Sequence, residues 1–263
     1  MIGLYKDIQV KKLEKKLILN KYLQESDIKE NYPALFLDRD GVIIKDCHYI
    51  SSPEEVILEE GICSLISSAK NSGFKIVVIT NQSGISKGFY GWPEYMKITN
   101  RLLNLLGNEN LLDAFYANGY SDISELSLWR KPNIGMISNA KKDLNIDIKN
   151  SILIGDRLTD IEAGYNSGIR KLFHVMTGHG KKERNFFNVR FLKNKKISIE
   201  KKEKLLPKVK DQFASLTFLD DLTEFPLLFF DCSIHAETKR DLLKKFNIDI
   251  KKDNKNFTLT TKG

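Results

Sequence analysis

The middle of the chain alternates short, wholly apolar runs with longer stretches whose apolar residues recur at helical spacing. A short apolar run between turn residues is typical of a buried strand, and apolar residues every three or four positions are typical of a surface helix. The expected strands lie at 34–37, 75–79, 114–117, 151–154, 171–174 and 213–219, and the expected helices at 61–72, 94–106, 134–143 and 160–167. This alternation predicts an α/β fold, a three-layer, Rossmann-like parallel sheet with helices on both faces.

The two ends of the chain do not follow this alternation. Residues 4–30 carry a partial apolar stripe among Lys and Glu, which predicts a helix that ends before Pro33. Towards the other end we expect a closing helix at 222–229, a helical stretch at 239–246 and a flexible polar terminus. We therefore divide the chain into an N-terminal helical extension (1–32), a central domain (33–230) and a partly flexible C-terminal extension (231–263).

The net charge of +8 is concentrated in one segment. Residues 181–210 hold twelve Lys and Arg against three Asp and Glu, so this segment alone exceeds the charge of the whole chain. A segment of this kind is most often a solvated loop or helix face, and we treat it as a basic insertion in the central domain. A phosphate-rich partner, either nucleic acid or a membrane surface, is the sharper alternative.

The composition indicates a soluble globular protein, with 41% hydrophobic and 29% charged residues. No stretch approaches the roughly 18 consecutive apolar residues that a membrane span requires, and the N-terminus lacks the apolar core of a secretory signal. The three cysteines, Cys47, Cys63 and Cys232, are too few and too widely spaced for a disulfide framework or a paired zinc motif. We expect a cytoplasmic protein without a membrane span.

Polar motifs follow the first two expected strands. Asp38 and Asp40 lie two positions apart, so their side chains project to the same side of an extended chain, and Gly41 then allows a sharp turn. Such acid pairs also serve turns and helix starts. The next strand ends in Thr-Asn-Gln-Ser-Gly at 80–84, whose hydroxyl and amide donors can cradle a phosphoryl group or simply form a polar turn.

Two further motifs lie later in the chain. Arg130 and Lys131 precede Pro132, which suits a helix start, and the two cations can be solvated or can neutralise phosphate charge. Asp156 follows the fourth expected strand, and Asp160 lies at the entry of the next helix, where a carboxylate can cap the helix.

Taken together, the four motifs predict phosphoryl transfer. Each falls at the carboxyl end of an expected parallel strand or in the connection that leaves it, and such sheets carry their active sites at that edge. The order of acid pair, hydroxyl, cation and acid supplies a nucleophile, a proton donor, a phosphate anchor and metal ligands.

With these residues the sequence resembles the haloacid dehalogenase-like (HAD) superfamily, whose four motifs are matched by Asp38/Asp40, Thr80, Lys131 and Asp156/Asp160. It is most similar to the branch that contains D-glycero-D-manno-heptose-1,7-bisphosphate 7-phosphatase and histidinol-phosphatase. The matching stretches are 36–43, 49–55, 80–85, 130–132 and 155–156, and the resemblance covers roughly residues 34–180.

The resemblance implies a Mg²⁺-dependent phosphatase. Asp38 would attack the phosphorus and form an aspartyl-phosphate, while Asp40 would act first as general acid and then as general base. Mg²⁺ would be held by Asp38, the backbone carbonyl of Asp40 and Asp156. Lys131 would stabilise charge on the phosphoryl group, and Thr80 would bind its oxygens. The other residues that resemble substrate-contacting positions are Asn81, Gln82, Ser83, Arg130, Arg157, Asp46, His48 and Tyr49.

Several features depart from that branch. Its small zinc loop, built from cysteines and a histidine, has no counterpart at 118–129, so we expect no zinc. His48 has Cys47 beside it and no other ligand nearby in the sequence, which we interpret as a residue of the pocket wall. We expect Asp160 to be a helix cap, or to support the metal ligands without binding the metal, rather than to be a direct ligand. The connections after Asp40 and Gly84 are too short for a large cap domain, and an open site suits a larger substrate or closure by a second subunit, as in a homodimer.

Three functions stay open at this point. The leading hypothesis is a phosphatase for a sugar phosphate or bisphosphate, such as D-glycero-D-manno-heptose 1,7-bisphosphate, with histidinol phosphate as a related substrate. The second is a nucleic-acid 3′-phosphatase, since related folds with a similar Thr-Asn-Gln motif remove 3′-phosphates from DNA and the basic insertion would contact the backbone. The third, a non-catalytic scaffold that keeps the fold, is disfavoured because all the catalytic acids are present.

Overall fold

The computed structural model of the 263-residue chain describes its central part almost continuously and its ends in pieces. The described residues are 9–13, 16–20, 31–107, 111–121, 128–184, 203–205, 214–225, 248–253 and 256–261. They fall into two compact units, Met1–Pro226 and Leu227–Gly263.

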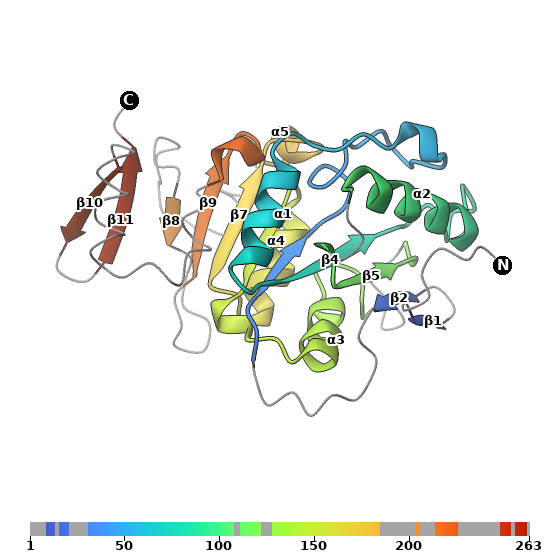
Figure 1. Cartoon of the computed structure of the whole chain (residues 1–263), viewed down its shortest axis with the longest axis horizontal. Coiled ribbons are helices and arrows are strands. Elements are labelled where there is room, and N and C mark those ends of the chain that lie inside the picture. Colours follow the sequence, from blue (N-terminus) through green and yellow to red (C-terminus); the bar gives the residue numbers. More distant parts are fainter. Residues whose placement is uncertain are drawn as a thin grey trace. The chain divides into compact units, whose positions relative to one another are not determined.

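The first unit is built on a nine-stranded sheet whose six central strands are parallel (Figure 1). In spatial order these strands are β5 (Ala114–Asn118), β4 (Lys75–Asn81), β3 (Ala34–Leu37), β6 (Ile152–Gly155), β7 (Lys171–Val175) and β9 (Ser215–Leu219). Every residue of β3, β5 and β6 is buried, as expected for parallel strands covered on both faces. All six strands coincide with the apolar runs, so this part of the fold prediction is confirmed.

Antiparallel strands extend both edges of the parallel sheet. At one edge β1 (Gln9–Leu13) and β2 (Lys16–Asn20) form a hairpin, and β2 pairs with β5. The predicted N-terminal helix is therefore wrong at these residues. At the other edge β8 (Glu203–Leu205) pairs with β9. Of the basic insertion at 181–210, the structure describes only β8 and the short helix α5 (Gly180–Glu183) with Arg184, and the other residues lie outside the described part.

Four longer helices flank the parallel strands. They are α1 (Ile62–Asn71), α2 (Trp92–Leu105), α3 (Gly135–Leu144) and α4 (Leu158–Ser167), each within two residues of its predicted bounds. The apolar residues of α3 and α4 join one core cluster with Phe36 and Val77, while the buried residues of α1 lie outside that cluster. Since neighbouring residues of a strand face opposite sides, this division is that of a three-layer α/β domain.

The connections that leave β3 and β4 hold no cap domain. The first, residues 38–61, contains one 3₁₀ turn at Pro53–Glu55 and two isolated bridges made by Ile44, and the second is residues 82–91. Both connections are fully described, so the prediction of no large cap at these two positions is confirmed. The carboxyl ends of β4, β3 and β6, which are neighbours in the sheet, are left accessible from one side.

The predictions for the C-terminal region are met only in part. The closing helix expected at 222–229 begins as a 3₁₀ turn, Leu222–Glu224, after which Phe225 is extended and the remaining residues lie outside the described part. The second unit contains the hairpin of β10 (Ile248–Asp253) and β11 (Asn256–Thr261), where we expected a flexible end. The helical stretch expected at 239–246 lies outside the described residues. None of the described helices combines the length and the apolar character that a membrane span requires.

Candidate active site

The ammonium group of Lys131 lies between two carboxylates at the carboxyl edge of the sheet. Its Nζ is 3.0 Å from Asp38 Oδ1 and 2.7 Å from Asp160 Oδ1, and it donates to the backbone oxygen of Ile79 at 2.9 Å. Three partners match the three hydrogens of an ammonium group. Burial alone would lower the pKa of Lys131, but the adjacent Asp160 and Asp38 outweigh it and raise the pKa. Lys131 is therefore a fixed, desolvated cation.

Asn81, the last residue of β4, fixes the backbone at Lys131. Its side-chain nitrogen donates to the backbone oxygen of Lys131 at 3.1 Å, and its side-chain oxygen accepts from the backbone nitrogen of Lys131 at 3.0 Å. Both ends of one amide thus hold the segment that carries the cation. This explains why the sequence places an amide, rather than another hydroxyl, at this strand end.

Asp38 follows β3 and is almost fully buried. Its Oδ1 accepts a hydrogen bond from the backbone nitrogen of Arg39 at 2.7 Å in addition to its contact with Lys131. Burial raises the pKa of Asp38 to about 7, and the neighbouring Asp160 and Asp40 add to this rise, whereas Lys131 opposes it. A carboxylate in this setting is poorly solvated, which favours its reaction with an electrophile once it is ionised.

Three carboxylates converge beside Lys131. One oxygen each from Asp38, Asp156 and Asp160 lies within 4.8 Å of the other two, and all three residues are buried. Burial, followed by the charges of Asp160 and Asp38, raises the pKa of Asp156 well above its ordinary value. Asp156 Oδ1 is buried with no hydrogen-bond partner among the described residues. Lys131 alone does not balance this charge, so the donor set fits a hard divalent cation such as Mg²⁺.

Asp160 has a second role at the start of α4. Its Oδ2 accepts from the backbone nitrogen of Arg157 at 2.9 Å, as in a capping box. The helix cap expected from the sequence is confirmed. The other carboxylate oxygen of Asp160, Oδ1, lies beside Lys131.

Two glycines make room for the carboxylate of Asp156. Gly41 has φ +82° and Gly178 has φ +54°, both in the left-handed region, and a Cβ added to either would collide with Asp156 Oδ2. The same oxygen accepts from the backbone nitrogen of His179 at 2.7 Å. Gly41 was part of the predicted motif, whereas nothing in the sequence pointed to Gly178.

Asp40 is held by two side chains that donate to it. Arg39 Nη2 is 2.8 Å from Asp40 Oδ1 and 3.0 Å from Oδ2, and Gln82 Nε2 donates to Oδ2 at 2.8 Å. The amide oxygen of Gln82 accepts from Arg39 Nη2 at 3.0 Å and from Tyr90 OH at 2.5 Å. This network fixes the orientation of the second acid of the pair.

Most of the predicted site residues line one cavity at this edge. The predicted residues in its wall are Asp38, Asp40, Asp46, His48, Tyr49, Asn81, Gln82, Ser83, Lys131 and Arg157. Thr80, Arg130 and Asp156 are not among the lining residues. Thr80 is 1% exposed and its hydroxyl accepts from Gln82 Nε2 at 2.7 Å, so Gln82 is the member of this pair that faces the cavity. Arg130 donates instead to the backbone oxygen of Tyr120 at 3.1 Å.

Comparison with known proteins agrees with this arrangement. A family model described as polynucleotide kinase 3 phosphatase matches residues 35–205. A D-glycero-beta-D-manno-heptose-1,7-bisphosphate 7-phosphatase of Mesorhizobium japonicum is 40% identical over 144 residues, which cover 52% of this chain and 66% of the relative. A D-glycero-alpha-D-manno-heptose-1,7-bisphosphate 7-phosphatase of Photorhabdus laumondii is 40% identical over 151 residues, which cover 55% of this chain and 82% of the relative. The chain belongs to the HAD-like phosphatases.

Solved structures agree with this family. A Mesorhizobium loti protein assigned to the HAD-like phosphatases has a TM-score of 0.56 and 34% identity, covering 62% of this chain and 81% of its own. The D,D-heptose 1,7-bisphosphate phosphatase of B. bronchiseptica, complexed with magnesium and phosphate, has a TM-score of 0.57 and 22% identity, covering 81% of this chain and 99% of its own. The second likeness concerns the fold alone.

The HAD-like site contains residues that the sequence analysis did not single out. Arg39, between the two acids, was read only as part of the motif, yet it is buried and pairs with Asp40. Tyr90 and His179 also line the cavity. The position of Arg39 between two acids, just after a buried strand, could have flagged it, but Tyr90 and His179 carry no comparable local signal.

His174, on β7, makes a hydrogen bond with the backbone of Asp156. Its Nε2 lies 2.9 Å from the backbone oxygen of Asp156, and Arg184 Nε donates to its Nδ1 at 3.4 Å. A carbonyl oxygen can only accept, so Nε2 carries the hydrogen. Since Nδ1 accepts from Arg184, it carries no hydrogen, and the ring is therefore neutral. Burial, and then the charge of Arg184, lowers the pKa of His174 to about 3.

This shift predicts an acid-sensitive contribution to the stability of the enzyme. Between an unfolded pKa of roughly 6.5 and the folded value, the unfolded chain binds a proton that the folded chain does not, so stability falls as the pH falls. Relative to His174→Gln, which removes the titrating group, the unmodified protein should lose about 2 kcal/mol between pH 7 and pH 5. Urea unfolding of both proteins across this range measures the difference. Parallel stability curves would contradict a neutral, buried His174.

Proposed function

We propose that this protein is a Mg²⁺-dependent phosphomonoester hydrolase that acts through an aspartyl-phosphate on a sugar phosphate or bisphosphate. The observation that carries the proposal is the contact of Lys131 Nζ with both Asp38 and Asp160, beside the unpaired oxygen of Asp156. A desolvated cation next to a nucleophilic carboxylate and a divalent-cation site is the arrangement that phosphoryl transfer requires, since its transition state spreads negative charge over three oxygens.

In the proposed reaction Asp38 supplies the attacking oxygen. Both of the hydrogen-bonding contacts described for Asp38 use Oδ1, so we assign the attack to Oδ2. A bond forms between Oδ2 and phosphorus while the ester bond breaks, and the leaving alcohol takes a proton from Asp40. A water molecule then gives its proton to Asp40 and attacks phosphorus, which releases phosphate and restores the carboxylate of Asp38.

The cation would be held by the carboxylates of Asp38 and Asp156 and by the backbone carbonyl of Asp40. When bound, Mg²⁺ would neutralise charge on the phosphoryl oxygens. The oxygens of Asp160 are already beside Lys131 and the backbone nitrogen of Arg157, which supports a positioning role for Asp160 rather than direct ligation.

The network around Asp40 bears on its role as acid and base. In the structure its carboxylate lies against Arg39 and Gln82, so reaching a leaving oxygen in the cavity involves an exchange of these partners. We propose that Gln82 guides this exchange, because the same amide group contacts Asp40 and Tyr90 and also lines the cavity.

The proposed substrate is a small phosphorylated sugar such as D-glycero-D-manno-heptose 1,7-bisphosphate, which is the substrate named for the relatives. The cavity wall supports this, since it offers Asp46, Ser83 and Arg157 for hydroxyl and phosphate groups. A cytoplasmic location and closure of the open cavity by a second copy belong to the same proposal.

Phosphate release from a panel of phosphorylated compounds tests this substrate class. The panel contains heptose 1,7-bisphosphate, other sugar phosphates and bisphosphates, histidinol phosphate and an oligonucleotide with a 3′-phosphate, each with Mg²⁺ and with a chelator. We expect the highest kcat/KM for a sugar bisphosphate, with activity lost in the chelator. Turnover on none of the sugar phosphates would contradict the proposal.

A nucleic-acid 3′-phosphatase is the second candidate, favoured by the family model that matches residues 35–205 and by the basic insertion at 181–210. Phosphate contacts make such binding steeply dependent on salt. For this candidate, the 3′-phosphorylated oligonucleotide would be the best substrate and its KM would rise as salt is added. Deletion of residues 185–202 would weaken oligonucleotide turnover while leaving the turnover of small phosphate esters intact.

A further inference from the structure

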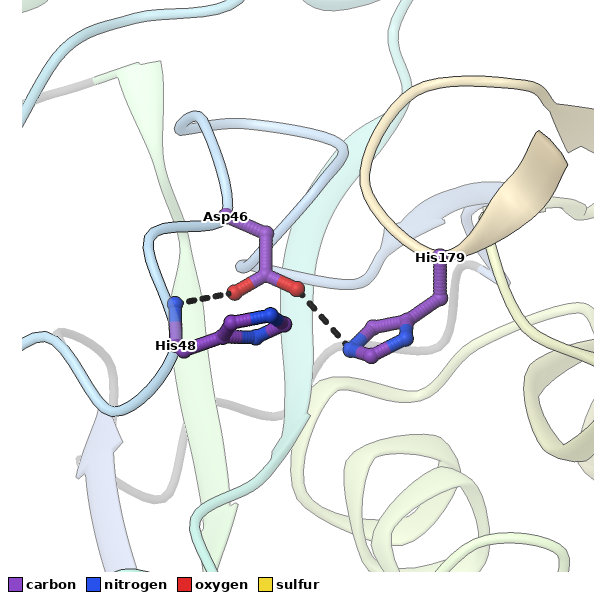
Figure 2. A group of neighbouring side chains, drawn as sticks. All are labelled: Asp46, His48 and His179. Carbon is purple, nitrogen blue, oxygen red and sulfur yellow. Dashed lines mark hydrogen bonds and ion pairs between the residues drawn. The ribbon is translucent and has the colours of Figure 1, made fainter. Parts of the chain in front are cut away.

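A second cluster of metal-ligating side chains lies in the wall of the same cavity. Asp46, His48 and His179 each bring one ligand atom within 4.8 Å of the other two (Figure 2). Asp46 Oδ2 is 3.0 Å from His179 Nε2, and the rings of His48 and His179 have centroids 5.6 Å apart. None of these residues belongs to the group of Asp38, Asp156 and Asp160.

Two distant segments build this cluster. Asp46 and His48 lie in the connection that leaves β3, where His48 and Tyr49 have φ of 54° and 56°. The left-handed region is costly for side chains of this size, so the surrounding structure must hold these two residues in place. Asp46 Oδ1 accepts from the backbone nitrogen of His48 at 2.9 Å, which leaves Oδ2 directed at His179. Figure 2 shows the three side chains gathered between the loop and the start of α5.

We propose that Asp46, His48 and His179 form a binding site for a divalent transition-metal ion of the zinc class, separate from the Mg²⁺ site. Two imidazoles and one carboxylate are a donor set that such ions prefer, whereas Mg²⁺ prefers oxygen donors and retained waters. Three protein ligands leave a fourth position of a tetrahedral ion open. Since all three residues line the cavity, that position is available to an oxygen of the substrate.

The separations need only small adjustments. Bonds of about 2.0–2.1 Å at tetrahedral angles put ligand atoms roughly 3.3 Å apart. The 3.0 Å between Asp46 and His179 is already close to this value. His48 is exposed, so rotation of its side chain can close the remaining gap within the 4.8 Å limit without disturbing the core.

The surrounding charges are compatible with a cation at this position. Arg157 is the cation that faces His179, and its Nε is 3.1 Å from Glu183 Oε1, so the pair is close to neutral. Burial, and then Arg157, lowers the pKa of His179, which keeps its ring in the neutral form that binds metals. Asp46 contributes the negative charge.

This site differs from the zinc loop whose absence led us to expect no zinc. That expectation considered residues 118–129 and the sequence neighbours of His48, and His179 is 131 positions away from His48. The backbone nitrogen of His179 donates to Asp156 Oδ2 at 2.7 Å, so an ion held by its imidazole would lie next to the catalytic acids. The inference rests on the ligand set alone and does not depend on the proposed phosphatase activity.

Zinc titration of the untagged full-length protein in excess Mg²⁺, followed by calorimetry, tests the site. We expect one equivalent of Zn²⁺ to bind, and we expect His48→Ala, His179→Ala and Asp46→Asn each to weaken this binding by roughly 100-fold or more, since even residues behind a metal ligand can account for that much. Cobalt(II) should give the absorption spectrum of a tetrahedral ion with nitrogen and oxygen ligands. Circular dichroism confirms that each variant is folded.

Two control variants separate this site from other zinc ligands. Cys47→Ser removes the exposed thiol that lies between Asp46 and His48 in the chain, and Asp38→Asn disables the acidic group. Both should retain the zinc equivalent. Failure of the unmodified protein to bind one equivalent, loss of it in Cys47→Ser or Asp38→Asn, or its retention in folded His48→Ala and His179→Ala would each overturn the proposal.

Discussion

Asp38→Asn should lower the rate of phosphate release by roughly 10³-fold or more on every substrate that the protein hydrolyses. An amide cannot form the acyl-phosphate, and the substitution keeps the shape of a side chain whose Oδ1 accepts from the backbone nitrogen of Arg39. The loss should appear in kcat, because the attack on phosphorus occurs only after the substrate is bound. Steady-state kinetics on the best substrate of the panel measures the effect.

The fold of this variant should be intact. Burial raises the pKa of Asp38 to about 7, so a neutral side chain is already well tolerated at this position. Urea unfolding at pH 7 should show little loss of stability, which separates a chemical effect from a structural one. Asp147→Asn is a matched control, since Asp147 caps an exposed 3₁₀ turn through Lys149 and Asn caps as well as Asp. Unchanged turnover in Asp38→Asn would instead support a scaffold without catalytic function or a different nucleophile.

The central sheet could be predicted because its strands are short and buried on both faces. In β3, for example, all four residues are fully buried, so the sequence there is a continuous apolar run. Asp38 and Asp156 followed from the same pattern, since they come directly after such runs and such residues gather at one edge of the sheet. Lys131 lies in the connection 13 positions after the end of β5, so strand order alone does not determine its position.

The N-terminal hairpin could not be predicted in this way. Residues 4–30 show only a partial apolar stripe among Lys and Glu, which we interpreted as a helix. Strand β2 pairs with β5, about one hundred positions later in the chain, and that partner is invisible to any local pattern. Tertiary contacts therefore decided the outcome where the local preference was weak.

The side-chain contacts within the site could not be predicted from the sequence. Thr80 is predicted to bind phosphoryl oxygens, and the sequence did not show that Gln82, two positions later, donates to its hydroxyl. His48 was interpreted without a ligand partner because His179, which follows β7, is 131 positions away in the sequence. Strand order fixes where a motif begins, while the direction of each side chain depends on neighbours that the sequence does not reveal.

Lys131→Met should combine a loss of rate with a loss of stability. Methionine has nearly the length of lysine, so the substitution removes the charge and leaves the volume. Removing one fixed charge beside the reacting group should lower kcat by roughly 10²–10³-fold. Removing the partner of two buried carboxylates should also reduce the free energy of unfolding by about 3 kcal/mol at neutral pH. Lys142→Met, on the exposed side of α3, is the control for the loss of a lysine.

The pH dependence of Lys131→Met then distinguishes electrostatic stabilisation from simple substrate binding. Lys131 lowers the pKa of Asp38, so without it the Asp38 carboxylate is protonated up to a higher pH. The acidic limb of the kcat/KM profile should therefore move to higher pH in the variant. The lost stability should return in part as the pH falls, because protonation of Asp38 removes one of the unpaired charges. A variant with a raised KM, an unchanged kcat and an unmoved profile would show that Lys131 contributes only to binding, and that the ion pairs it makes with Asp38 and Asp160 do not tune the nucleophile.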